Sequence, residues 1–224
     1  MQIIDQVFVV PGVVANPYLI VDADGLTVID AGLPRSEKKI IAYVKSLGKQ
    51  AQDIKRIIIT HADFDHIGGL AALKAATAAR TYASRIEADA IALGQSSREI
   101  KPTGVSLRRV LFSLLRPFMK LKPFPVDEIL TEGQTLPVLG GLQVLETPGH
   151  TPGHISLFAP ATGILFCGDS IVSDEKGLQG SRPGLTWDET KARESEQKQA
   201  ALGAQIVCSG HGQVVKDAKG KIPV

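Results

Sequence analysis

The hydrophobic pattern of the first half predicts short strands separated by helices. Runs of aliphatic and β-branched residues, which are typical of strands, lie at 3–10, 18–22, 26–31 and 54–60. The sequence "DADG" at 22–25 is typical of the turn between two of them. Apolar residues at helical spacing predict a helix over 36–49 that begins behind a Ser36 N-cap, and an alanine-rich helix over 68–80. The order is strand, strand, strand, helix, strand, helix.

The second half has the same character. Its predicted strands lie at 142–148, 154–160, 164–169 and 205–210, with a helix over about 186–202. A capping box formed by Thr186 and Glu189 predicts where that helix begins. The stretches "NPYLIVDADGLTVIDAG" and "PGHISLFAPATGILFCGD" both read as strand, turn, strand, and both end in an aspartate beside a glycine. We interpret them as two copies of one hairpin-plus-helix unit.

Length and composition favour one domain with a full hydrophobic core. The 224 residues are 44% hydrophobic and have a mean hydropathy of +0.09. There is no basic leader and no apolar run of the roughly 20 residues that a membrane span needs. We therefore expect a cytoplasmic protein. Cys167 and Cys208 lie in apolar surroundings, which predicts buried free thiols rather than a disulfide framework.

The candidate chemistry is concentrated in "THADFDHIGG" at 60–69, directly after a predicted buried strand. Imidazole and carboxylate side chains occupy four of six consecutive positions there: His61, Asp63, Asp65 and His66. Nitrogen and oxygen donors of this kind suit Zn²⁺, Mn²⁺ or Fe²⁺, and the lack of cysteine argues against a structural zinc finger. The other three histidines of the chain, at 150, 154 and 211, also lie at predicted strand ends next to glycine. The pattern indicates one metal site that uses the histidines of the whole chain.

These motifs resemble the metal-binding signature of the metallo-β-lactamase superfamily. In that family a His-x-His-x-Asp-His motif is followed by histidine in a "TPGH" loop, aspartate in a "GD" loop and histidine in a "GHG" loop. The chain has the motifs in the same order, and "VIDAG" around Asp30 matches as well. The resemblance implies an α/β fold, a four-layer αββα sandwich of two mixed sheets flanked by helices, over 1–224.

The resemblance also implies a ligand set for two divalent metal ions, with Zn²⁺ expected and Fe²⁺ or Mn²⁺ as alternatives. One ion is expected on His61, Asp63 and His150, and the other on Asp65, His66 and His211, with Asp169 bridging. A hydroxide between the ions would be the nucleophile, and Asp65 would guide the proton to the leaving group. His154 is expected to contact no metal and to hydrogen-bond a ligating carboxylate, that of Asp169. Asp30 is expected to orient a residue of the first motif.

Asp63 is the one departure from the signature, because the family has histidine there. With three carboxylates, two divalent ions and one hydroxide, the formal charge of the centre is zero, against +1 for the family pattern. We expect a weaker Lewis acid that accepts harder ions. A binuclear site, a mononuclear site and a site that has lost its chemistry all remain open.

A basic amphipathic insertion is predicted at about 97–126. Seven lysines and arginines face one glutamate in it, which gives this segment a formal charge of +6 and the rest of the chain −4. It also carries a broad apolar stripe: Val105, Leu107, Val110, Leu111, Leu114, Leu115 and Phe118. A lid over the substrate, a homodimer contact, core packing and a membrane-surface contact are the alternatives. The chain has no aromatic and basic platform, so we do not expect nucleic acid as a partner.

The function expected from these features is a metal-dependent hydrolase acting on a small ester, thioester or lactone, with a β-lactam less favoured. No G-x-S-x-G elbow and no P-loop is present to support a serine hydrolase or a nucleotide-binding protein. Two alternatives are kept. One is a mononuclear iron dioxygenase acting on a persulfide, and the other is a non-catalytic module that binds a small acid.

Overall fold

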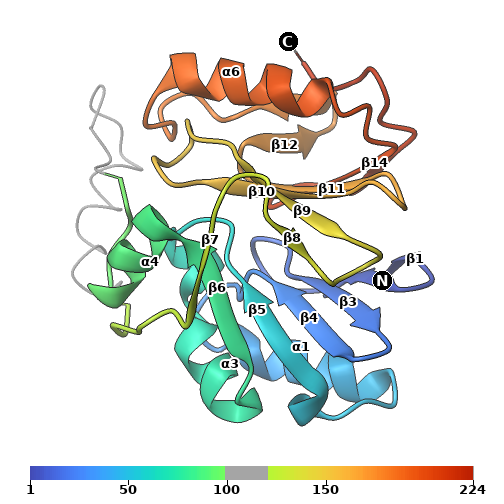
Figure 1. Cartoon of the computed structure of the whole chain (residues 1–224), viewed down its shortest axis with the longest axis vertical. Coiled ribbons are helices and arrows are strands. Elements are labelled where there is room, and N and C mark those ends of the chain that lie inside the picture. Colours follow the sequence, from blue (N-terminus) through green and yellow to red (C-terminus); the bar gives the residue numbers. More distant parts are fainter. Residues whose placement is uncertain (99–120, 224) are drawn as a thin grey trace.

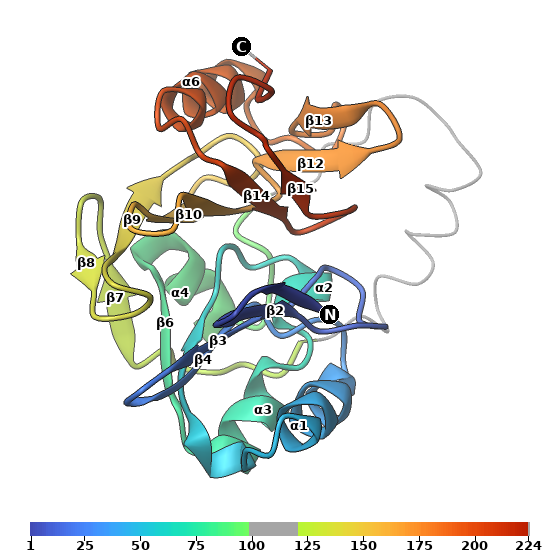
Figure 2. The same ribbon diagram turned by 90° about the vertical axis from the view of Figure 1, so that its right-hand side faces the viewer.

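The computed structural model describes residues 1–98 and 121–223, whose strands form two large sheets lying face to face (Figures 1 and 2). The first sheet has the order β1 (Gln2–Ile4), β2 (Val7–Val9), β3 (Tyr18–Asp22), β4 (Gly25–Ile29), β5 (Ile54–Ile58), β6 (Arg80–Ser84), β7 (Glu128–Leu130). The second has the order β15 (Val215–Lys216), β14 (Ile206–Ser209), β11 (Ile164–Gly168), β10 (Ile155–Ala159), β9 (Leu142–Glu146), β8 (Thr135–Leu136). A separate hairpin joins β12 (Ile171–Asp174) and β13 (Gly177–Gly180).

Helices cover the outer faces of both sheets, which confirms the predicted αββα sandwich. Those that belong to the first half are α1 (Ser36–Ser46), the 3₁₀ turn η1 (Ala51–Asp53), α2 (Phe64–Ile67), α3 (Leu70–Thr77) and α4 (Arg85–Ala92). Apolar residues of α1, α3 and α4 pack in one cluster with the outer face of the first sheet. Helix α6 (Glu189–Ala200) lies over the second sheet, at the top of Figure 1. None of the described helices is long and apolar enough to cross a membrane.

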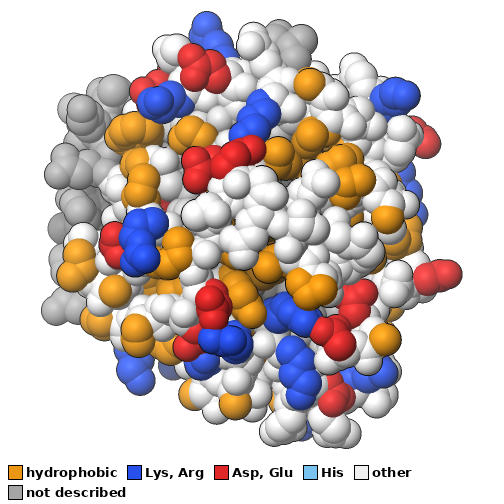
Figure 3. Space-filling view, viewed as in Figure 1, with side chains coloured by type: hydrophobic (Ala, Val, Ile, Leu, Met, Phe, Trp, Pro, Cys, Tyr) orange, Lys and Arg blue, Asp and Glu red, His pale blue; other side chains and the backbone are white. Residues whose placement is uncertain are grey.

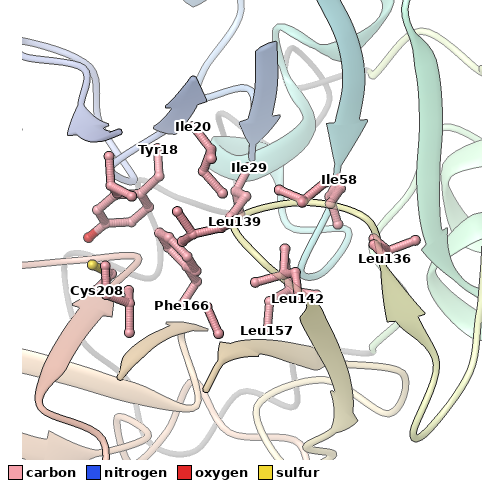
Figure 4. Packing of buried hydrophobic residues seen from close by; sticks show 14 of the residues in the cluster. Tyr18, Ile20, Ile29, Ile58, Leu136, Leu139, Leu142, Leu157, Phe166 and Cys208 are labelled. Atoms are coloured by element: carbon pink, nitrogen blue, oxygen red, sulfur yellow. The ribbon is translucent and has the colours of Figure 1, made fainter. Parts of the chain in front are cut away.

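The core between the sheets is built from alternate residues of facing strands (Figure 4). Ile20 and Ile58 from the first sheet meet Leu157 from the second, and all three are fully buried. Tyr18 packs edge-on against Phe166, with ring centroids 5.3 Å apart. This continuous apolar layer holds the strand ends of the two sheets in fixed positions, and those ends carry the candidate site.

The structure repeats the predicted hairpin-plus-helix unit. Strand β3 pairs antiparallel with β4, which pairs in parallel with β5 after α1. In the second sheet, β10 pairs antiparallel with β11, which pairs in parallel with β14 after α6. The carboxyl ends of β4 and β11 therefore occupy equivalent places in the two halves, and so do those of β5 and β14.

The predicted strand over 3–10 is wrong in one respect, because it is a hairpin of two strands. Asp5 and Gln6 form the turn between β1 and β2. The apolar run concealed this break, since both strands bury alternate residues. The sequence prediction also missed β6, α4 and the short strands β7, β8, β12, β13 and β15.

Both predicted helix caps are wrong. Ser36 already belongs to α1, which follows Arg35 in a left-handed conformation without a side-chain cap. At α6 the cap is Asp188, whose Oδ1 accepts from the backbone amides of Thr190 and Lys191 at 2.9 and 3.0 Å. The Thr186 hydroxyl instead donates to the carbonyl of Arg182. In each helix the N-cap position is occupied by a residue near the one that local propensity favoured: Arg35 instead of Ser36, and Asp188 instead of Thr186.

Most of the insertion expected at about 97–126, including its apolar stripe, lies outside the described residues. On the face seen in Figure 3, the coloured lysine and arginine side chains are interspersed with aspartate and glutamate. Neither sign of charge dominates the described part of that face.

Candidate metal centre

All five histidines of the chain gather where the strands of the two sheets end. The ring of His61, which follows β5, has its centroid 4.0 Å from that of His66 and 4.9 Å from that of His150. The ring of His154 lies 5.1 Å from His61, and that of His211 lies 5.6 Å from His66. His211 is partly exposed, and the other four are buried.

Ligand atoms of the predicted set form three groups that overlap. They are His61, Asp63 and His150; His61, His66 and Asp169; and Asp65, His66 and His211. Within each group the candidate atoms lie within 4.8 Å of one another. Because His61 and His66 are each shared by two groups, the three form one continuous cluster.

Asp169 lies between the two ends of this cluster. Its Oδ1 is 3.4 Å from Nε2 of His66. Its Oδ2 is 3.7 Å from Nε2 of His150 and 3.4 Å from Nε2 of His211. A carboxylate in this position faces both halves of the cluster at once.

The centre contains buried polar atoms that lack a hydrogen-bond partner. Among the described residues these include Nε2 of His61, Nε2 of His66 and Oδ1 of Asp169. A buried polar atom left without a partner costs about 1–3 kcal/mol. Three such atoms facing one another fit a divalent cation, which accepts nitrogen and oxygen donors. The donor set therefore fits the metal that the family pattern implies.

The Nδ1 atoms of the buried ligand candidates are held by other protein groups. His61 contacts Oγ1 of Thr60 at 3.0 Å, and His150 contacts Oγ of Ser181 at 3.1 Å. His66 contacts Oδ2 of Asp30 at 2.8 Å, and Asp30 also accepts from the amide and hydroxyl of Thr60. These contacts fix each ring so that Nε2 faces the centre, as is usual for metal-binding histidines.

His154 differs from the other histidines, because both of its nitrogens contact a backbone amide or a hydroxyl group rather than a candidate ligand atom. Nε2 accepts from the backbone amide of Asp169 at 3.1 Å, and Nδ1 contacts Oγ1 of Thr147 at 2.9 Å. The expected partner was the carboxylate of Asp169, and this is wrong, since the contact is to its main chain. Burial lowers the pKa of His154 to about 3, so the ring is neutral and can accept this bond.

The pKa values within the cluster shift as expected for closely packed charges. Burial lowers the pKa of His61 well below its usual range, which leaves the imidazole neutral. Burial opposes ionisation of Asp169, but the neighbouring His66 outweighs it and holds the pKa of Asp169 well below the usual range. Burial also opposes protonation of His66, but Asp30 and Asp169 raise its pKa well above 6.5. The cluster therefore stabilises positive charge at its centre.

Asp63 faces both histidines of its predicted metal group and also contacts two residues that the sequence did not predict. Its Oδ2 lies 3.2 Å from Nε2 of His150 and 3.7 Å from Nε2 of His61. The same carboxylate forms an ion pair with Arg98 and accepts from Oγ of Ser96 at 2.7 Å. Arg98 and Ser96 follow α4 and are distant in sequence from the motif.

Glu87 is a second residue that the sequence did not indicate. It is fully buried on α4, and its carboxylate accepts from the amide of Ala62 at 2.8 Å and from the amide of Gly153 at 3.0 Å. Hydroxyl groups of Thr151 and Ser97 complete its partners. Glu87 thereby connects the loop of the first motif to the "TPGH" loop. The capping-box pattern "SRIE" at 84–87 could have revealed α4, although not this use of the carboxylate.

Comparison with known proteins identifies the family. The family described as "Metallo-beta-lactamase superfamily" matches residues 10–211. The chain is 29% identical to the "Probable metallo-hydrolase YflN" of Bacillus subtilis, over 89% of this chain and 81% of that protein. It is 28% identical to a hydroxyacylglutathione hydrolase of Cereibacter sphaeroides, over 78% of this chain and 54% of that protein.

The solved structures agree with this assignment. A metallo-beta-lactamase of Cronobacter sakazakii with a HARLDQ motif superposes with a TM-score of 0.73 and 26% identity, over 94% of this chain and 79% of that one. The fold, the ordered motifs and the matched region lead to one conclusion: the chain belongs to the metallo-β-lactamase superfamily.

Proposed function

We propose that the chain is a metal-dependent hydrolase whose centre holds two divalent ions, with Zn²⁺ as the expected metal. One ion is assigned to His61, Asp63 and His150, and the other to Asp65, His66 and His211, with Asp169 between them. The observation that carries this proposal is the set of facing, unpartnered buried atoms of His61, His66 and Asp169. Such atoms are costly unless a cation satisfies them.

A pair of divalent ions supplies a nucleophile at neutral pH, because it lowers the pKa of bound water from 15.7 to about 7. Asp65 is suited to hold a proton during the reaction. Its Oδ2 lies 3.2 Å from Nε2 of His211, and its side chain is 31% exposed, against 14% for Asp63 and 8% for Asp169. It is therefore the centre's carboxylate that a substrate reaches most easily.

An ester, a thioester or a lactone is the proposed substrate class. The similarity to proteins named hydroxyacylglutathione hydrolase supports a thioester. The segment after β13 supports a substrate with an apolar part, because it places the side chain of Trp187 beside the "TPGH" loop. The backbone amide of Trp187 fixes this position by donating to the carbonyls of Gly149 and His150. The side chain of Trp187 is 44% exposed beside this loop.

The test is turnover of one glutathione thioester, one aryl ester and one acyl lactone by the chain after Zn²⁺ or Mn²⁺ loading. We expect metal-dependent hydrolysis of at least one compound, and a loss of about 10²-fold or more in Asp65→Asn. Asp24→Asn, an exposed aspartate in an ion pair with Arg56, is the matched control and should keep full activity. A fully loaded chain that hydrolyses none of the three would contradict the proposal.

A further inference from the structure

Asp63 is the residue at which the chain departs from the family signature, and its carboxylate is held from outside the motif. Oδ1 accepts from Oγ of Ser96 at 2.7 Å and lies 3.4 Å from Nε of Arg98. Oδ2 forms an ion pair with Nη2 of Arg98. The guanidinium thus contacts both oxygens, as in the two-point pairing that arginine forms with carboxylates.

The side chain of Asp63 is oriented toward the centre and not toward the amides of the helix that it precedes. Asp63 is the N-cap residue of α2, a position where aspartate normally accepts from the helix amides, yet its side chain makes no capping bond. The carboxylate points instead toward the centre, where Oδ2 faces His61 and His150. Arg98 and Ser96 hold it in that direction.

Arg98 differs in burial from the other lysines and arginines of the described residues. Of the lysines and arginines in the described residues, it alone is buried, with its side chain 5% exposed. A buried charge requires a partner of opposite sign, and Asp63 supplies it. The segment that carries Arg98 is also anchored next to the centre, because Ser97 donates to the buried Glu87 at 2.8 Å.

The formal charge shows what the pair achieves. Two divalent ions and the three carboxylates of Asp63, Asp65 and Asp169 sum to +1, whereas a signature with histidine at position 63 gives +2. When the positive charge of Arg98 is included, the formal charge of this chain's centre is +2, the same as with histidine at position 63. We propose that Arg98 is a positioning residue that orients and neutralises Asp63, so that the Asp63–Arg98 pair acts at the first metal position as a neutral histidine does. This inference rests on the proposed binuclear centre.

The proposal predicts the sign of each variant's effect on metal affinity. Removing Arg98 leaves the ligands more negative, while Ser96 still holds Oδ1 of Asp63 in place. The charge effect should therefore exceed the loss of orientation, and binding of the ion at His61, Asp63 and His150 should become tighter. Replacing Asp63 by histidine leaves the positive charge of Arg98 unpaired beside that ion, so binding of the ion should become weaker. Combining the two changes restores the original formal charge.

The experiment measures the dissociation constants of both Zn²⁺ ions by competition with a chromogenic chelator. We expect one of the two constants, that of the ion at His61, Asp63 and His150, to fall about tenfold in Arg98→Met and to rise about tenfold in Asp63→His. The double variant Asp63→His/Arg98→Met should return to within about threefold of the unmodified chain. Arg98→Lys, which keeps the charge, should also stay within about threefold.

The inference is overturned if Arg98→Met weakens Zn²⁺ binding or changes it less than about threefold, or if the double variant binds as weakly as Asp63→His alone. Circular dichroism checks that each variant is folded. If Arg98→Met does not fold, Arg98→Gln, which keeps a donor for Asp63 without the charge, takes its place with the same expectation. An unmodified chain that binds none of Zn²⁺, Mn²⁺ and Fe²⁺ overturns the proposed function and this inference together. One that binds two ions, with no effect at Arg98, overturns this inference alone.

Discussion

Nδ1 of His66 lies 2.8 Å from Oδ2 of Asp30, and both side chains are almost fully buried. The same carboxylate accepts two bonds from Thr60, so it is fixed on the far side of the ring from the centre. Second-layer contacts of this kind set the direction and basicity of a metal-binding imidazole.

Asp30→Asn should therefore weaken metal binding by about 10- to 100-fold while the chain stays folded. The backbone of residue 30 has a φ of 61°, a conformation that asparagine tolerates well, so the substitution isolates the loss of the carboxylate. Isothermal titration with Zn²⁺ measures the effect, with Asp24→Asn as the exposed control. Equal affinities for Asp30→Asn and the unmodified chain would show that Asp30 does not support His66.

His154 and His211 should respond differently to substitution. His211→Ala is expected to remove about one metal equivalent, because its Nε2 faces Asp65 and Asp169. His154→Ala removes the bond to the backbone of Asp169 and the contact with Thr147 but no candidate ligand atom, so it should keep the stoichiometry and lower affinity by about 10- to 100-fold. Elemental analysis with chelator competition distinguishes the two results. If His154→Ala lost one metal equivalent, His154 would be a metal ligand, which contradicts its assignment here.

Glu87→Gln should destabilise the chain, since glutamine places an amide donor where four donors converge on a carboxylate. The expected decrease in the free energy of unfolding is about 1–3 kcal/mol, measured by urea denaturation. Amides of the loops at Ala62 and Gly153 should also exchange faster. Glu128→Gln, at a side chain that is 39% exposed, is the control and should change stability by less than about 0.5 kcal/mol. Equal losses in the two variants would argue against the connecting role.

The two cysteines should be unreactive in the folded chain. Both are free and buried, as the sequence predicted, and burial raises the pKa of Cys167 to about 12. Since the thiolate is the reactive form, neither should react with a disulfide reagent at pH 8 until the chain is unfolded. Stoichiometric labelling in native buffer would show that the strands carrying them open more readily than this core implies.

Local patterns of the sequence were sufficient for most strands and helices of the two halves and for the grouping of the histidines. The αββα sandwich itself followed from the resemblance to the metallo-β-lactamase superfamily. Strand β11 is a buried apolar run and β5 ends in two buried isoleucines, and the histidines follow such predicted strands closely in the sequence. The roles of Arg98 and Glu87 could not be predicted in this way. Arg98 pairs with a residue 35 positions away, and Glu87 is buried by contacts with two separate loops. Partner choice over such distances follows from the packed structure rather than from local propensity.

The central claim is that this cluster is a binuclear metal centre, and metal content per chain tests it most directly. The measurement is elemental analysis of protein purified without added metal, and again after anaerobic reconstitution with Zn²⁺, Mn²⁺ or Fe²⁺. The account predicts close to two equivalents per chain for at least one of these ions, falling to about one in His211→Ala. A chain that takes up no more than one equivalent under every condition would contradict it.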